Sequence, residues 1–355
     1  MVFRIGSLLL VVAALVFGNG AATAQEKPTV IRVGAPTLPG HPYLLWGAPG
    51  IAQFKGWFDE EFAKDGIHVQ FIGFNGGGPM VGQALANGQI DFAGNGDMIS
   101  LIGKSAGIKS KLILPSGRLE NAYLLVRPDS KIHSIQDLRG KKVAYFKGNY
   151  IQLQVIRILA SQGMNEKDIR NVSMFGAPAI NALRNGDVDA VFGNSDSLLA
   201  VEKGLAKVVY NTQQGSVRFT AQAGLLVNED FARRYPQITE RFVKVIVNAS
   251  RWASEEANRD KVFSIWANSG IGNVPTFRRD YAGRPVADRL SPLLDPFFVA
   301  QYKDTQNLLI KLGLLRGQPV DIDQWFDRSY LNAALKDLHL ENYWVPLDAD
   351  GRRTH

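Results

Sequence analysis

One eight-residue pattern occurs twice in this chain, and it constrains the fold more than any other feature. Residues 84–91 read Ala-Leu-Ala-Asn-Gly-Gln-Ile-Asp, and residues 182–189 read Ala-Leu-Arg-Asn-Gly-Asp-Val-Asp. Each octet ends an expected helix, turns through Asn-Gly and starts an expected strand, because glycine supplies the left-handed conformation that stops a helix. A polar loop follows each strand, at residues 94–97 and 193–196. The repeat predicts two similar lobes with matching loops.

Short β-rich runs alternate with helical segments from Thr29 onward, which is typical of an α/β fold. The expected strands are 30–33, 68–71, 90–93, 123–127, 142–145, 172–175, 188–192 and 224–227, and the expected helices are 44–65, 80–86, 134–138, 150–162 and 179–184. Crossovers of this length predict a largely parallel sheet core. Ligands of open parallel sheets bind beyond the carboxyl ends of the strands, so two facing lobes would place both polar loops in one cleft.

The first 24 residues have the pattern of a cleaved secretory signal. Arg4 supplies a positive charge, an apolar run extends from Leu8 to Phe17, and small residues follow at 22–24. The apolar run is too short to cross a bilayer, which takes about 20 residues. We expect the exported chain to begin near Gln25. Because the chain has no cysteine, no lipid-modified cysteine can tether it, and we expect a freely soluble protein in the periplasm.

Composition argues against several other classes of protein. Without Arg4, 39 Lys and Arg residues stand against 33 Asp and Glu residues, a net charge of +6. This charge forms no clustered basic run, so nucleic-acid binding has no support. A cysteine nucleophile is excluded, and the five histidines show no metal-binding spacing. We therefore expect no enzymatic activity, no cofactor and no metal.

Several segments resemble the periplasmic binding proteins for aliphatic sulfonates, taurine and nitrate. They are Phe-Asn-Gly-Gly-Gly at 74–78, the octets with their loops, Asp-Leu-x-Gly-Lys-Lys-Val-Ala at 137–144 with Lys-Gly-Asn at 147–149, and the tail at 313–325. The resemblance implies a type II periplasmic-binding-protein fold, in which two hinge strands join two α/β lobes with a cleft between them. The first lobe would comprise residues 28–120 plus 222–355, and the inserted second lobe residues 121–221.

The same resemblance implies a receptor that delivers a small anionic organic ligand, first of all an aliphatic sulfonate, to an ABC transporter permease in the inner membrane. The receptor would act as a monomer. Taurine, nitrate, an aromatic sulfonate and a pyrimidine precursor stay open as ligands, and a periplasmic sensor stays open as a role. A thiamine-pyrimidine synthase shares the fold, but it relies on a cysteine-rich motif that this chain lacks.

Two glycine loops are candidate anion sites. Gly77 and Gly78 precede one helix, and Gly148 with Asn149 precedes another. Glycine lets backbone N–H groups approach a ligand, and the partial positive charge of a helix start suits an anion. A plain tight turn explains either loop equally well when it is taken alone. Facing each other across a cleft, the two loops favour anion binding.

Further candidates lie in the loops after the other strands. Asn95, Asp97, Ser195 and Asp196 could offer hydrogen bonds to the ligand, although both aspartates could instead cap helices. Arg118, close to Ser116, could clamp an anion bidentately or simply be solvated. The remaining candidates are Gly40 and His41 in the loop after the first strand, and Tyr150, which could wall the organic part of the ligand.

Overall fold

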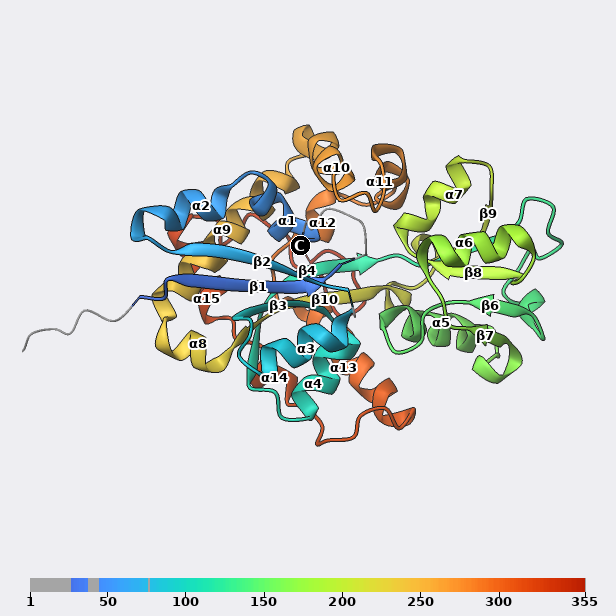
Figure 1. Ribbon diagram of the computed structural model, residues 1–355, viewed down its shortest axis with the longest axis horizontal. Helices are drawn as coiled ribbons and strands as arrows, with labels where there is room; N and C mark the ends of the chain where they lie inside the picture. Colours follow the sequence, from blue (N-terminus) through green and yellow to red (C-terminus); the bar gives the residue numbers. More distant parts are fainter. Residues whose placement is uncertain (1–26, 38–44, 76, 355) are drawn as a thin grey trace, which may run out of the picture.

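Two five-stranded sheets organise the chain. The structure is a computed structural model that describes residues 27–37, 45–75 and 77–354; the predicted signal at 1–24 lies outside them. The first sheet has the strand order β2-β1-β3-β10-β4, and the second has the order β7-β6-β8-β5-β9. We call the parts built on these sheets the first body and the second body. Figure 1 shows the two bodies end to end along the long axis, with β4 running toward the junction between them and β10 running back from it.

The strands and helices have the following bounds. The strands of the first sheet are β1 Val30–Pro36, β2 His68–Phe74, β3 Phe92–Gly96, β4 Ser110–Glu120 and β10 Ala221–Asn228. Those of the second are β5 Tyr123–Val126, β6 Lys142–Ala144, β7 Arg170–Val172, β8 Ala190–Gly193 and β9 Lys207–Asn211. The helices up to the second crossover are α1 Gly47–Phe54, α2 Trp57–Phe62, α3 Gly78–Ala86, α4 Asp97–Ser105, α5 Tyr150–Ser161, α6 Gly176–Asn185 and α7 Leu198–Glu202. The helices that follow are α8 Glu229–Arg234, α9 Pro236–Ser254, α10 Arg259–Ala267, α11 Val274–Asp280, α12 Val286–Leu290, α13 Pro296–Lys311, α14 Ile322–Trp325 and α15 Ser329–Asp337.

The two sheets have the same order of strand directions. In the first, β1 pairs in parallel with β2 and β3, while β10 pairs antiparallel with β3 and β4. In the second, β6 pairs in parallel with β7 and β8, while β5 pairs antiparallel with β8 and β9. The prediction of two α/β lobes is confirmed. Four strands of each sheet run in the same direction, which agrees with the expected largely parallel core. The exception is β10 in the first sheet and β5 in the second, each of which pairs antiparallel with both of its neighbours.

The octet repeat has a clear structural role. Gly88 and Gly186 take positive φ angles of 65° and 83° just after α3 and α6, as the Asn-Gly turn predicts. The last residue of each octet then bonds to the neighbouring parallel strand. The Asp91 carboxylate accepts from the Arg32 N–H, and the Asp189 carboxylate accepts from the Lys142 N–H, both at 2.8 Å. Each octet therefore ends a helix and anchors the next strand against a parallel neighbour, β1 in the first sheet and β6 in the second.

Aromatic packing stabilises the first body, and helices cover both faces of the second sheet. Phe92 of β3 is fully buried and stacks on Phe242 of α9 with ring centroids 4.0 Å apart, and Phe242 also stacks on Phe58 of α2.

In the second body, helices pack on both faces of the sheet. Side chains of α5 form one hydrophobic cluster with Tyr145, and Leu183 of α6 belongs to a separate cluster with Val191 of β8. Within the described residues, every helix is too short or too polar to cross a membrane.

Candidate functional site

The carboxyl ends of the parallel strands in both sheets point to one junction. Strands β1 to β4 end at one edge of the first sheet, and β6 to β9 end at one edge of the second. We call these the carboxyl edges. The chain passes between them twice, at residues 121–122 from β4 to β5 and at residues 212–220 from β9 to β10. Loops after parallel strands are where α/β sheets bind ligands, so the junction is the candidate site.

Gln154 of α5 ties the two crossovers together. Its side chain is fully buried, and Nε2 donates to the carbonyl of Glu120 at 2.8 Å and to the carbonyl of Phe219 at 3.1 Å. Glu120 ends β4, and Phe219 lies just before β10. One side-chain amide of the second body therefore fixes both connecting segments.

The first glycine loop starts α3, as the sequence predicted. Gly77 has a φ angle of 71°, and Pro79 occupies the first turn of the helix. Asn95 supports this loop: its Nδ2 donates to the Gly78 carbonyl at 3.0 Å, and its Oδ1 accepts from the Gly96 N–H at 3.1 Å. A Cβ at Gly78 would lie 2.5 Å from Asn95 Oδ1, so the close approach requires glycine.

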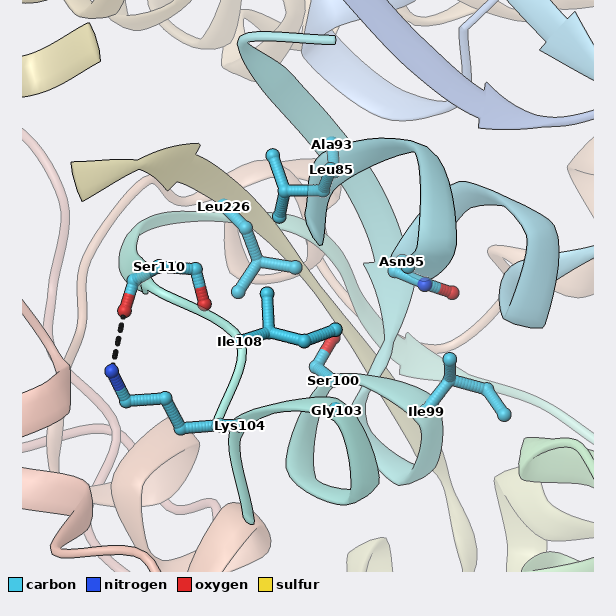
Figure 2. Close-up of a pocket in the computed structure, with 11 residues that line it drawn as sticks. Leu85, Ala93, Asn95, Ile99, Ser100, Gly103, Lys104, Ile108, Ser110 and Leu226 are labelled. Atoms are coloured by element: carbon cyan, nitrogen blue, oxygen red, sulfur yellow. Dashed lines mark hydrogen bonds between the residues drawn. The ribbon is translucent and has the colours of Figure 1, made fainter. Parts of the chain in front are cut away.

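Figure 2 shows Asn95 beside a cavity of about 10 Å³ between α3, α4 and β10, which is room for one water molecule. Ser100, Ile108 and Leu226 line the same cavity. Its size rules out an organic ligand. The amide of Asn95 is thus used to hold the α3 loop, and its predicted contact with a ligand stays a prediction.

The second glycine loop starts α5. Asn149 caps this helix, because its Oδ1 accepts from the Ile151 N–H at 3.0 Å. Gly148 has a φ angle of 84°, and its N–H donates to Gln152 Oε1 at 2.8 Å. A Cβ at Gly148 would find no atom within 4 Å. The loop is open, and the helix start carries partial positive charge.

Tyr150 reaches from the second body to the first. A Cβ at Gly96, at the end of β3, would lie 3.2 Å from the Tyr150 ring, and the phenol donates to Asn194 Oδ1 at 3.3 Å. Burial raises the pKa of the Tyr150 phenol. Three carboxylates add to that shift, and they belong to Glu120, Asp196 and Asp97. The structure therefore brings Tyr150, Gly96 and Asn194 together at the junction, surrounded by acidic side chains.

Asp97 faces α13. Its side chain is 2% exposed, and its carboxylate accepts from Thr305 Oγ1 at 2.8 Å and from the Met98 N–H at 2.7 Å. Burial raises the pKa of the Asp97 carboxyl, and the guanidinium of Arg157 opposes that shift. Arg157 of α5 pairs with Asp304 at 2.9 Å and donates to Thr305 Oγ1. Asp97 is thus part of a polar chain that joins the two bodies.

Asp196 and Ser195 lie in a short 3₁₀ turn after β8. Burial raises the pKa of the Asp196 carboxyl, while hydrogen bonds from the backbone and hydroxyl of Ser197 lower it. Ser195 is buried. These local bonds fit the capping role that the sequence left open, and contact with a ligand stays a prediction for both residues.

Arg118 lies in the protein interior. Its side chain is 1% exposed, and its guanidinium donates to Asp295 Oδ2 and to the Leu293 carbonyl, both at 2.7 Å. These bonds hold the segment that leads into α13, so the arginine is neither solvated nor directed to the glycine loops. Ser116 lies in the same strand, where its carbonyl packs against Gly47. Gly40 and His41 lie outside the described residues.

The sequence analysis missed an acidic cluster at the first crossover. Glu120 accepts from Trp46 Nε1 at 3.2 Å and lies 3.6 Å from Arg289, which pairs with Asp280 at 2.8 Å. Burial raises the pKa of Glu120, and Arg289 opposes this shift. Asp280 also accepts from the Tyr123 phenol at 2.6 Å. Asp280 and Arg289 lie about 160 residues beyond Glu120 in the sequence, so no local pattern pointed to the cluster.

The described residues contain no group of three or more His, Cys, Asp or Glu side chains arranged to hold a metal ion. The junction brings together helix starts, buried carboxylates and the ring of Tyr150.

Comparison with known proteins places these features in context. Residues 50–259 match the model of the family described as NMT1/THI5 like. A Bacillus subtilis (strain 168) protein that bears an aliphatic sulfonates-binding name is 30% identical over 256 residues, which cover 70% of this chain and 74% of that protein.

Solved structures agree with this comparison. The structure from Methylobacillus flagellatus KT, described as the periplasmic sulfonate-binding protein SsuA of a sulfonate ABC transporter, is 28% identical with a TM-score of 0.80, covering 90% of this chain and 97% of that one. The desulfurization enzyme DSZB has the same fold at 19% identity, with a TM-score of 0.67 and coverage of 87% and 99%.

Proposed function

The chain belongs to the NMT1/THI5-like family, and on that basis we propose that it is a periplasmic receptor for a small organic sulfonate, which it delivers to the permease of an ABC transporter. The sulfonate binds at the junction between the two bodies. Residues 1–24 act as a secretory signal, residues 28–120 with 222–355 form one lobe, and residues 121–221 form the other. The receptor acts as a monomer.

One observation carries this proposal. The glycine-led starts of α3 and α5 stand at the carboxyl edges of two sheets with the same order of strand directions, and the two edges meet at the crossovers. Backbone N–H groups at such helix starts bind oxyanions without needing a cationic side chain. A hinge of two crossover segments lets the bodies close around the ligand.

The ligand leaves the site unchanged in this proposal. The relatives named above for sulfonate binding are described as binding proteins. The described residues offer no metal cluster, and the chain has no cysteine to serve as a nucleophile. Mass spectrometry of the sulfonate recovered after incubation tests this point, and a new product would contradict it.

A binding panel with residues 25–355 tests the main proposal. The panel holds alkanesulfonates, taurine, arylsulfonates, nitrate, bicarbonate and thiamine precursors, measured by thermal shift and then by calorimetry. A ligand at 100 times its Kd adds about 2.7 kcal/mol to the free energy of unfolding, so binding of a sulfonate is expected to raise the melting temperature visibly. Binding of a neutral heterocycle or a metal, with no response to any sulfonate, would refute the proposal.

Two glycine variants of α3 give a matched pair. Gly78→Ala places a Cβ 2.5 Å from Asn95 Oδ1 and disturbs the loop, whereas Gly82→Ala meets only Ile108 at an ordinary 3.9 Å. We expect Gly78→Ala to weaken sulfonate binding by about tenfold or more, because two charge-assisted hydrogen bonds are worth more than 1.4 kcal/mol. Gly82→Ala keeps the affinity of the natural chain. Equal affinities for both variants would exclude the α3 loop from the site.

A further inference from the structure

Two phenylalanine rings of the second body lie exposed at its carboxyl edge. Phe146 follows β6 and is 36% exposed; Phe175 precedes α6 and is 45% exposed. The rings contact each other edge to face, with centroids 5.0 Å apart and an interplanar angle of 62°. Contact of paired aromatic rings with water is unfavourable, and exposed apolar patches of this kind mark binding surfaces.

Hydrogen bonds fix both rings beside the second glycine loop. The Tyr145 N–H donates to the Val172 carbonyl at 3.3 Å, and the Lys147 N–H donates to Ser173 Oγ at 3.2 Å. These bonds join the loops after β6 and β7, so the rings lie on the segments that lead to Gly148 and to α6. The aromatic pair is therefore continuous with the proposed anion site.

Charge and open space accompany the rings. Lys147 is exposed, and it makes no ion pair with the carboxylates of the described residues. A Cβ at Gly148 or at Gly176, the first residue of α6, would find no atom within 4 Å. The first body adds an apolar side chain at its own carboxyl edge, since Met80 in the first turn of α3 is 49% exposed. A free cation, open helix starts and apolar groups fit a ligand with an anionic head and an apolar body.

We infer that Phe146 and Phe175 bind the organic part of the ligand, and that the ligand is a sulfonate whose organic part is apolar and at least the size of an aromatic ring. This inference rests on the proposed function and names the substrate class within it. A short or polar sulfonate, such as methanesulfonate or taurine, leaves both rings in water. An arylsulfonate covers them while its head lies at the helix starts.

Calorimetry with two probes tests this inference. The natural chain is expected to bind naphthalene-2-sulfonate about 10 to 100 times more tightly than methanesulfonate, as burial of aromatic surface predicts. The double variant Phe146→Ala with Phe175→Ala loses this preference and keeps its affinity for methanesulfonate within about threefold. Phe54→Ala, which removes a ring that is 52% exposed at the C-terminal end of α1, retains the preference.

Each other outcome overturns a distinct statement. Equal affinity of the natural chain for both sulfonates leaves the sulfonate receptor intact and refutes the apolar ligand. A preference that survives in the double variant shows that other residues bind the organic part. Absence of binding to any sulfonate refutes the proposed function together with the inference. A Phe146→Leu, Phe175→Leu variant with circular dichroism like that of the natural chain separates loss of ring contact from loss of folding, and it shows an intermediate preference.

Discussion

Replacing Gln154 by leucine tests whether one buried amide holds the junction. The side chain makes two hydrogen bonds to crossover carbonyls, at 2.8 and 3.1 Å, and each net bond contributes about 1 to 1.5 kcal/mol. Its Oε1 is buried without a partner, so leucine also removes an unsatisfied acceptor and recovers about 1 kcal/mol. The expected loss is therefore about 1 to 2 kcal/mol in the free energy of unfolding.

Urea unfolding followed by two signals measures this loss. All six tryptophans lie at positions 46–57 or 252–344, outside the second body, so their fluorescence reports the first body, whereas circular dichroism reports both. Gln162→Leu removes an exposed amide from the end of the same helix and should change the stability by less than about 0.5 kcal/mol. If Gln154→Leu is as stable as Gln162→Leu in both signals, the two hydrogen bonds from Gln154 to the crossover carbonyls do not stabilise the fold.

Gln154→Glu sharpens the same test, because it keeps the size of the side chain and replaces the donor with an oxygen. A buried carboxylate next to two carbonyls is strongly unfavourable. We expect a loss larger than that of Gln154→Leu at pH 7, and a smaller one at pH 5, where protonation of the carboxyl restores one donor. A loss that does not change with pH would contradict this account.

Three further predictions concern stability and its dependence on pH and salt. Burial raises the pKa of the Asp97 carboxyl, so its contribution to stability is complete below the pKa of the unfolded chain and is lost as pH rises through the pKa of the folded protein. Asp97→Asn should therefore reduce the fall in the free energy of unfolding between pH 4 and 8, measured by urea titration. Parallel pH profiles for the variant and the natural chain would contradict this prediction. Arg157→Met breaks an ion pair whose Asp304 side chain is 44% exposed. A double-mutant cycle on Arg157 and Asp304 should give a coupling energy of about 0.5 to 1 kcal/mol that shrinks in 1 M salt. A coupling energy that is unchanged by salt would argue against a solvent-exposed ion pair. Phe92→Ala removes a fully buried ring stacked on Phe242 and should cost about 3 to 5 kcal/mol by chemical denaturation; a loss below 1 kcal/mol would show that the core refills the cavity.

Local patterns in the sequence predicted the repeated helix–turn–strand units well. The Asn-Gly turns, the strand before each glycine loop and the capped start of α5 depend on residues within a few positions of one another, and all are found where expected. The expected helix at 44–65 is instead divided between α1 and α2, because Gly56 takes a φ angle of 74°.

The two strands that complete the sheets were not predicted. β4 contains Pro115 and Gly117, residue types that weaken the signal of a strand, yet both pair with β10 across irregular register. β9 lies at the edge of the second sheet and pairs only with β5. Such strands are stabilised by a partner distant in the sequence, and their own residues carry little of the signal.

The roles of the candidate site residues depended on the same kind of distant partner. Arg118 had the right charge for an anion clamp, but Asp295 and Leu293 hold its guanidinium from 175 or more positions away. Asp97 is likewise held by Thr305. The sequence therefore predicted which loops reach the junction, while the partner of each side chain followed only from the packing of the C-terminal helices.

The insertion of the second body between β4 and β10 also sets an order of assembly during synthesis. All five strands of the second sheet lie within residues 123–211, so they can pair as soon as that segment has left the ribosome. The first sheet lacks a central strand until β10 has been made, because β10 lies between β3 and β4. Its completion closes a loop of about one hundred residues, and a loop already folded into a compact unit brings its ends together at less entropic cost than a flexible one. The inserted segment therefore acts as a folded linker that presents β10 to the gap it fills.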